Sequence, residues 1–200
     1  MKKILIYAGA HIGKNLLRLS KNFDECYAFE ASPVIFKKLK ANTKNRKNIY
    51  IFNVALTVEG SPNIVFHTYD GMPGSGSMSS EMCDRHSHRV KGIKRHRVPA
   101  VNLMNFLKEK NINHISHFFS DLQGLDFPVL QTLEPLITEG KIDKITCEVE
   151  QDDKENHYKD LTENRRCNFD RLLKDKYIIT SIEGEKEWLT LDITWTRCSD

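Results

Sequence analysis

The chain has 200 residues, 28% of them charged and 40% hydrophobic, with a formal net charge of +3 at pH 7. This length suits one domain with a substantial core, and no internal repeat or linker marks a second one. The longest apolar stretches fall far short of the ~20 residues that a membrane helix requires. The apolar stretch within residues 1–10 is also too short for a secretory signal.

The cysteines are odd in number, widely scattered and without a C-x-x-C pair. We therefore expect reduced thiols and a cytoplasmic protein. The five positions are Cys26, Cys83, Cys147, Cys167 and Cys198.

Apolar strand-like runs alternate with helix-like stretches, which is the pattern of an α/β fold. We predict strands at Lys3–Ala8, Glu25–Glu30, Ile49–Thr57, Ile64–Thr68, Ile115–Asp121, Lys144–Glu150, Tyr177–Ile182 and Trp188–Thr196. Helices are expected at Gly13–Asn22, Pro33–Asn42, Leu103–Glu109, Phe127–Thr138 and His157–Lys174. The short polar segment 183–186 predicts a hairpin between the last two strands. We therefore expect a mostly parallel sheet, with helices on both faces, that ends in an antiparallel hairpin.

The first strand ends in a glycine turn, Gly9-x-x-x-Gly13, and the second ends on an acid, Glu30. Glycines at this place let the backbone approach a ligand without an intervening Cβ. An acid at the tip of the second strand is placed to accept hydrogen bonds from ribose hydroxyls, as in other doubly wound sheets. Together these features predict a site for a nucleotide-type cofactor.

The spacing of the turn excludes two common cofactor loops. A Walker loop has four residues between its glycines and a Ser or Thr after the lysine, whereas here three residues intervene and Asn15 follows Lys14. The dinucleotide pattern G-x-G-x-x-G is also absent. What remains is the looser turn used by other adenosine-containing cofactors, with S-adenosylmethionine as the leading candidate.

Residues 69–98 show neither a helical nor a strand period, and we expect a basic loop insertion there. Residues 85–97 contain six Lys or Arg side chains and no acid. One interpretation is a binding segment for an anionic substrate, such as a phosphorylated sugar, an acidic glycan or RNA. The other is a solvated loop without a specific partner. The candidate substrate-binding residues in this segment are His86, His88, Arg89, Lys94 and Arg95.

Cys83, His86, His88 and His96 invite a metal interpretation of the same segment. Zinc sites show paired ligands at short regular spacing, which this cluster lacks, and the neighbouring cations oppose a divalent ion. We therefore predict no metal site.

The strand before Asp121 predicts that this carboxylate lies at the mouth of the central cleft. An acid there can hold the cofactor amine, position the acceptor or remove a hydroxyl proton. Alternatively, Asp121 caps the following helix. Gln123 and Asp126 are weaker candidates, and Asp126 would also suit a helix N-terminus.

These motifs resemble those of the FkbM-type methyltransferases, a branch of the class I S-adenosylmethionine-dependent enzymes. Tyr27-Ala-Phe-Glu-Ala-Ser-Pro33 is similar to the family pattern Y-A-F-E-P-x-P and is the most specific match. Gly9-Ala-His-Ile-Gly13 resembles the turn G-A-N-x-G. Further matches are Asn53-Val-Ala-Leu56, the Ser-rich stretch 74–80, Val98–Leu107, Ser120–Asp126 and Thr146–Glu150.

The chain also departs from the family pattern. Tyr7 replaces an acid that helps to hold the methionine amine, and Phe119 replaces a lysine. Gln123 replaces a glutamate, Met104 an aspartate and His11 an asparagine. The turn, Glu30 and Asp121 are retained, so we expect cofactor binding to persist.

The resemblance implies a Rossmann-like, seven-stranded methyltransferase fold and in-line methyl transfer from a sulfonium to an oxygen. In that arrangement Glu30 holds the ribose. The other implied cofactor-binding residues are Gly9, Ala10, His11, Gly13, Ala31, Asn53, Val54 and Asp121. Asp121 and Glu148 are the implied catalytic candidates, with Glu150 as an alternative to Glu148, and Gln123 is expected to contact the substrate.

Family acceptors are typically sugar hydroxyls, so O-methylation of a carbohydrate or glycoconjugate is the leading hypothesis. One alternative is an RNA-directed methyltransferase or a nucleic-acid-binding protein that uses the basic segment. The scarcity of aromatic residues there disfavours base stacking. A third hypothesis, suggested by Tyr7 and Phe119, is a cofactor-binding protein without catalysis.

Overall fold

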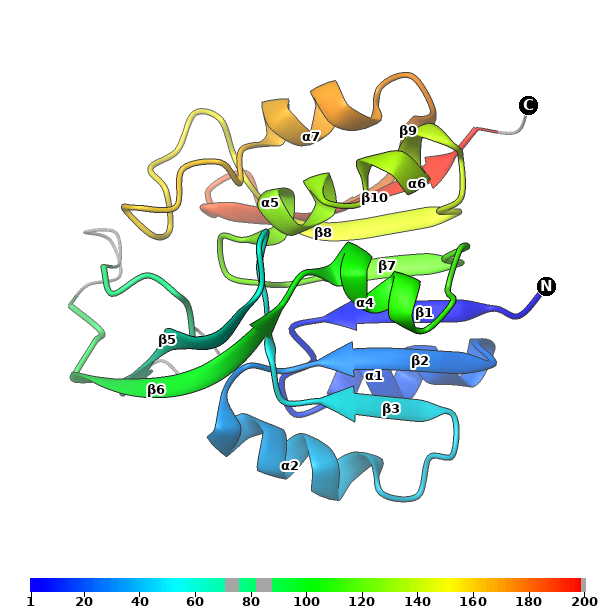
Figure 1. The fold of residues 1–200 in the computed structure, drawn as a ribbon. Helices are drawn as coiled ribbons and strands as arrows, with labels where there is room; N and C mark the ends of the chain where they lie inside the picture. Colours follow the sequence, from blue (N-terminus) through cyan, green and yellow to red (C-terminus); the bar gives the residue numbers. More distant parts are fainter. Residues whose placement is uncertain (71–75, 82–87, 199–200) are drawn as a thin grey trace.

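The computed structural model describes residues 1–70, 76–81 and 88–198, which contain two β-sheets flanked by helices (Figure 1). The larger sheet has seven strands in the order β3-β2-β1-β7-β8-β10-β9. Their bounds are β1 Ile4–Ala8, β2 Glu25–Phe29, β3 Ile49–Phe52, β7 His117–Ser120, β8 Lys144–Glu150, β9 Tyr177–Glu183 and β10 Thr190–Arg197.

Neighbouring strands from β3 to β8 pair in parallel, and β10 pairs antiparallel with both β8 and β9. The mostly parallel sheet and the terminal antiparallel hairpin are therefore confirmed. The apolar composition of β1, which is buried along its whole length, suits a central position with both faces covered.

Helices cover both faces of this sheet, as predicted. In Figure 1 the helices α4, α5, α6 and α7 lie in front of the sheet and α1 lies behind it. The bounds are α1 Lys14–Leu19, the short helix η1 Ser20–Asn22, α2 Pro33–Thr43, α4 Leu103–Glu109, α5 Asp126–Gln131, α6 Glu134–Thr138 and α7 Arg166–Leu173.

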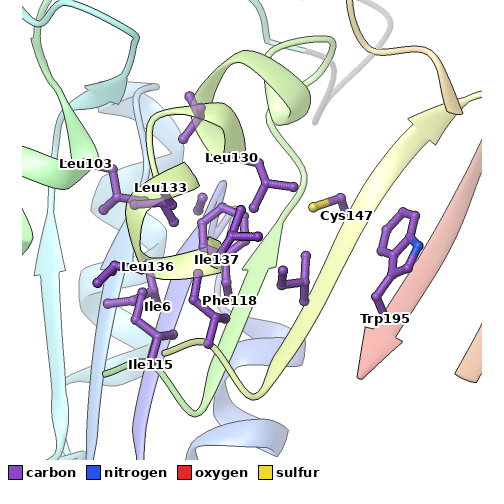
Figure 2. Close-up of a cluster of buried hydrophobic side chains, with 14 of the residues drawn as sticks. Ile6, Leu103, Ile115, Phe118, Leu130, Leu133, Leu136, Ile137, Cys147 and Trp195 are labelled. Carbon is purple, nitrogen blue, oxygen red and sulfur yellow. The ribbon is translucent and has the colours of Figure 1, made fainter. Parts of the chain in front are cut away.

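Two hydrophobic cores hold these layers together, because alternate residues of each strand point to opposite faces. The larger core contains Ile6, Phe118 and Trp195 of the sheet with Leu130 of α5 and Leu133, which lies between α5 and α6 (Figure 2). The smaller core, on the other face, packs Leu5 and Tyr7 of β1 against Leu16 and Leu39 of α1 and α2.

A three-stranded sheet lies beyond the carboxyl ends of β1, β2 and β3 (Figure 1). Its strands are β4 Ala55–Leu56, β5 Ser61–Asp70 and β6 Gly92–Val101. The loop predicted for residues 69–98 is therefore wrong over residues 69–70, which end β5, and over residues 92–98, where the basic sequence is a β-strand. Its cations obscure the strand period because they occupy both faces of β6.

Three other predicted elements need correction. The strand Ile49–Thr57 divides between β3 and β4, which belong to different sheets. The helix Phe127–Thr138 divides into α5 and α6, because Pro135 would clash with the carbonyl of residue 131 inside one continuous helix.

The helix predicted at His157–Lys174 begins only at Arg166. The preceding segment is held in a non-helical form by buried contacts. Asn164, fully buried, accepts from the Phe127 amide at 2.9 Å and donates to the Glu148 carbonyl at 3.0 Å. The His157 amide donates to Glu150 Oε1 at 2.8 Å.

Within the described residues, no helix has both the length and the apolar character needed to span a membrane.

Candidate active site

The turn after β1 is built by backbone contacts with the end of β2. The amides of Gly9 and Ala10 both donate to the Phe29 carbonyl, at 3.0 and 2.8 Å. Gly9 and Gly13 adopt φ values of 78° and 83°, in the left-handed region that suits glycine. His11 lies in the same region at φ 48°, where an L-residue is strained. Strain of this kind is often found at ligand sites.

Glu30 directly follows β2, and the same turn fixes its carboxylate. The amide of His11 donates to Oε2 and the amide of Ser32 donates to Oε1, each at 2.8 Å. Only 8% of Glu30 is exposed, and this burial raises its pKa to about 7 although the two amide bonds oppose the shift. The carboxylate is thus held in one orientation with lone pairs left to accept from a ligand.

A first cavity of about 420 Å³ lies between this edge of the large sheet and the small sheet. The large-sheet side provides Gly9, His11, Glu30, Ala31, Val54, Asp121 and Gln123. The small-sheet side provides Phe66, Thr68, Lys94 and His96, and Lys38 of α2 also lines the cavity. The cavity therefore combines apolar walls with two acids, Glu30 and Asp121, on the large-sheet side and with the ion pair of Lys94 and Asp70 on the small-sheet side.

A second cavity of about 580 Å³ meets the first at Gly9, His11 and Asp121. Tyr7 and Phe119 line it as a stacked pair with ring centroids 4.5 Å apart. Its other lining residues are Ala10, Lys14, Asn15, Arg18 and Asp192. Two cations and two carboxylates thus surround one space, which suits a ligand carrying both charges.

Asp121, Gln123 and Glu148 form a connected polar group at the carboxyl ends of β7 and β8. Gln123 Nε2 lies 2.5 Å from Asp121 Oδ1 and 3.4 Å from Glu148 Oε2. The Tyr158 hydroxyl donates to Gln123 Oε1 at 3.1 Å, which fixes the orientation of the amide. Like His11, Gln123 has a positive φ, at 54°.

Burial and mutual repulsion raise the pKa values of these acids. The pKa of Asp121 is raised by the surrounding protein, which partly desolvates its carboxylate, although the side chain is exposed to the two cavities that it lines. The pKa of Glu148 is raised by burial and by the nearby charges of Asp121, Asp126 and Asp192. The pKa of Asp192, an exposed residue, is raised to about 6, first by partial desolvation and then by the nearby charge of Asp121. A positively charged ligand group would relieve this repulsion.

Most of the predicted cofactor residues line one or both cavities. The exceptions among the described residues are Asn53 and Gly13. Asn53 instead donates to the Glu30 and Ala31 carbonyls at 2.8 and 3.1 Å, so it supports the segment that carries Glu30. Gly13 packs against α2, where an added Cβ would lie 2.7 Å from Leu39 Cδ1.

The residues predicted to bind the substrate, and the catalytic candidate Glu148, do not lie together. Gln123 and Lys94 line the first cavity. Arg95 lies on the opposite face of β6, and His88 and Arg89 are exposed before that strand. His86 lies outside the described residues. Glu148 lines neither of the two described cavities and reaches this region through Gln123.

Sequence reasoning missed Asp192, Arg18 and Lys38 as residues that line the cavities. Asp192 has no nearby motif, since it meets the site only because β10 pairs with β8 and places it opposite Glu148. Arg18 lies four positions after Lys14, and this helical spacing was the available signal. Lys38 lacked a comparable local signal.

The strand order, the single antiparallel strand, and the glycine turn followed by Glu30 define a class I methyltransferase fold. The chain belongs to the FkbM methyltransferase family, whose domain matches residues 8–170. Comparison with curated proteins gives no significant match.

Solved structures share the fold at low sequence identity. SMU.1697c from Streptococcus mutans, solved with S-adenosylhomocysteine, is 9% identical with a TM-score of 0.55 and aligns over 98% of this chain and 89% of its own. The fibrillarin pre-rRNA processing protein of Methanococcus jannaschii is 11% identical with a TM-score of 0.53, over 98% and 66% of the two chains.

Proposed function

We propose that the protein is an S-adenosylmethionine-dependent O-methyltransferase that acts on a hydroxyl of a sugar or glycoconjugate. The observation that carries this proposal is the pair of cavities that meet at Gly9, His11 and Asp121. An adenosyl group with an amino-acid arm needs two such spaces, one mainly apolar and one charged. Membership of the FkbM family supports the same chemistry.

The first cavity suits the adenosyl half. The Glu30 carboxylate is fixed by two amides and can accept from both ribose hydroxyls. Ala31 and Val54 offer apolar surfaces on which the adenine can lie. Gly9 keeps the backbone open between the ribose and the second cavity.

The second cavity suits the methionine half. Lys14 and Arg18 can bind its carboxylate, and Asp192 can bind its ammonium group. Tyr7 takes the place of the acid found in the family, and its hydroxyl accepts from Asn15 at 3.1 Å. The carboxylate missing at position 7 is thus supplied from β10.

When bound, the cofactor supplies an electrophilic methyl group on a sulfonium. The protein aligns this group with the acceptor hydroxyl, which accounts for much of the rate gain in such displacements. Asp121 opens onto both cavities, so its carboxylate is placed to accept the hydroxyl proton. Gln123 donates to both Asp121 and Glu148 and so fixes the two side chains relative to each other.

Calorimetric titration with S-adenosylmethionine and S-adenosylhomocysteine tests the cofactor site. We expect saturable binding that Glu30→Ala abolishes. Glu109→Ala, an exposed acid on α4, should leave it unchanged. Binding of neither compound to the folded protein would contradict the proposal. If the cofactor binds, a screen of sugars and glycans for methyl incorporation identifies the acceptor.

A further inference from the structure

The strand β6 carries cations on both of its faces. Lys94 and His96 line the first cavity, whereas Arg95 and Arg97 alternate with them and are exposed on the other face. A single strand therefore provides one basic row inside the site and another outside it.

The outer row lacks acidic partners in the described part of the chain. Lys94 pairs with Asp70 at 3.0 Å, but Arg95 and Arg97 form no ion pair with any described residue. Two further cations, Arg89 and Lys91, are exposed immediately before the strand. Such an accumulation of one charge attracts an oppositely charged partner.

The outer face of β6 also carries apolar side chains. Among the residues of β5 and β6 that pair on this face, no aromatic ring is exposed. Arg97 lies opposite Val65, which is 46% exposed, and the neighbouring Ile93 is 45% exposed. The partners of Arg95 and Ile93 on β5 are His67 and Tyr69, and both rings are buried. The face thus presents charge and aliphatic surface without a platform for stacking bases.

The two faces of β6 meet at a strand edge that no described strand pairs with along residues 92–97. One edge pairs with β5, and β4 pairs with the other edge only at Ala100 and Val101. Along residues 92–97 no described strand covers that second edge. A chain-like ligand can therefore pass from the outer row to the cavity across the width of one strand.

We propose that this outer face of β6 is an extended binding site for an acidic glycan, whose acceptor sugar enters the small-sheet side of the first cavity at Lys94 and His96. Arg95 and Arg97 would bind acidic groups on neighbouring sugar units, since guanidinium groups pair with such anions in a forked geometry. Val65 and Ile93 would contact the C–H faces of the sugar rings. The inference rests on the proposed function and specifies its substrate class.

A labelled heparin oligosaccharide, used as an acidic glycan probe, tests the site by fluorescence anisotropy over a salt series. We expect binding at low salt that weakens as salt is raised. The double variant Arg95→Gln/Arg97→Gln should lose at least about tenfold in affinity, the scale of one charged hydrogen bond. The control Lys44→Gln/Lys47→Gln removes the same charge after α2, at the opposite edge of the sheet, and should change affinity little.

Equal losses in both double variants would overturn the inference, because binding would then follow net charge alone. It would also be overturned if labelled oligouridylate of matched charge bound more tightly than heparin, which would indicate a nucleic-acid surface. Titration of the same variants with S-adenosylmethionine keeps the two proposals apart. Normal cofactor binding without heparin binding rejects only the glycan site, whereas heparin binding without cofactor binding rejects the proposed function.

Discussion

A Cβ atom placed on Gly9 would lie 1.9 Å from the carbonyl oxygen of Asp121. The ends of β1 and β7 are therefore in direct backbone contact, and the Asp121 amide also donates to the Ala8 carbonyl at 3.1 Å. Both cavities meet at this contact, and the contact holds Gly9 of the turn against Asp121, the candidate base. A side chain at position 9 would separate them.

Gly9→Ala is therefore expected to be strongly destabilising and to abolish S-adenosylmethionine binding. Gly140→Ala is a matched control, since Gly140 has φ 65° but its added Cβ would meet only the Arg197 side chain, at 3.4 Å from Cδ. The control should lose about 1–2 kcal/mol from left-handed strain alone. Thermal unfolding and calorimetry measure both effects. Similar stability losses in the two variants would show that the close contact between Gly9 and the Asp121 carbonyl adds nothing to the cost of the substitution.

The sequence was sufficient to predict the central strands, because continuous apolar runs such as β1 are typical of buried parallel strands. It was also sufficient to place Glu30 and Asp121 directly after such strands, at the carboxyl edge of the sheet. The strand β6 was missed because its side chains alternate between two basic surfaces rather than between core and solvent. Asp192 was missed because its proximity to Glu148 depends on the long-range pairing of β8 and β10.

Cofactor affinity is expected to depend on the ionisation of Glu30. Its pKa is raised to about 7 by burial, so the carboxylate is ionised above that pH and protonated below it. A protonated carboxyl loses acceptor capacity for ribose hydroxyls. Methylthioadenosine lacks the titratable amino-acid arm and therefore reports on Glu30 alone. Its affinity should fall as the pH drops below 7, with a limiting slope of about tenfold per pH unit.

Glu30→Gln should bind methylthioadenosine weakly at every pH and with a flat profile. Calorimetric titrations from pH 5.5 to about pH 8.5 cover the range around the shifted value. An equally steep profile in the variant would assign the pH dependence to another group.

Asp126 should make the protein less stable as the pH rises. This carboxyl is fully buried and accepts from Ser120 Oγ at 2.6 Å and from the Leu122 amide at 3.0 Å. Burial, with a contribution from Asp121, raises its pKa to about 8. The folded state thus retains a proton that the unfolded state releases near pH 4. The free energy of unfolding should fall from about pH 4 to about pH 8.

Asp126→Asn retains an acceptor oxygen but has no proton to lose, so it should remove part of this slope. Urea unfolding at a series of pH values measures the difference between variant and wild type. Asp175→Asn alters an exposed acid and should keep the wild-type slope. A variant slope equal to that of the wild type would show that Asp126 does not carry the effect.

Asp192 should contribute to binding of the amino-acid arm and not of the adenosyl group. It lines only the second of the two described cavities, together with Lys14 and Arg18, and a nearby ammonium would favour its ionised form. Asp192→Asn should weaken S-adenosylmethionine binding about tenfold, which is typical of one lost charged hydrogen bond. Its affinity for methylthioadenosine should stay unchanged, because that ligand leaves the second cavity empty. Equal losses for both ligands would instead mean that the substitution disturbs the whole site, and Asp192 would then not replace the acid missing at Tyr7.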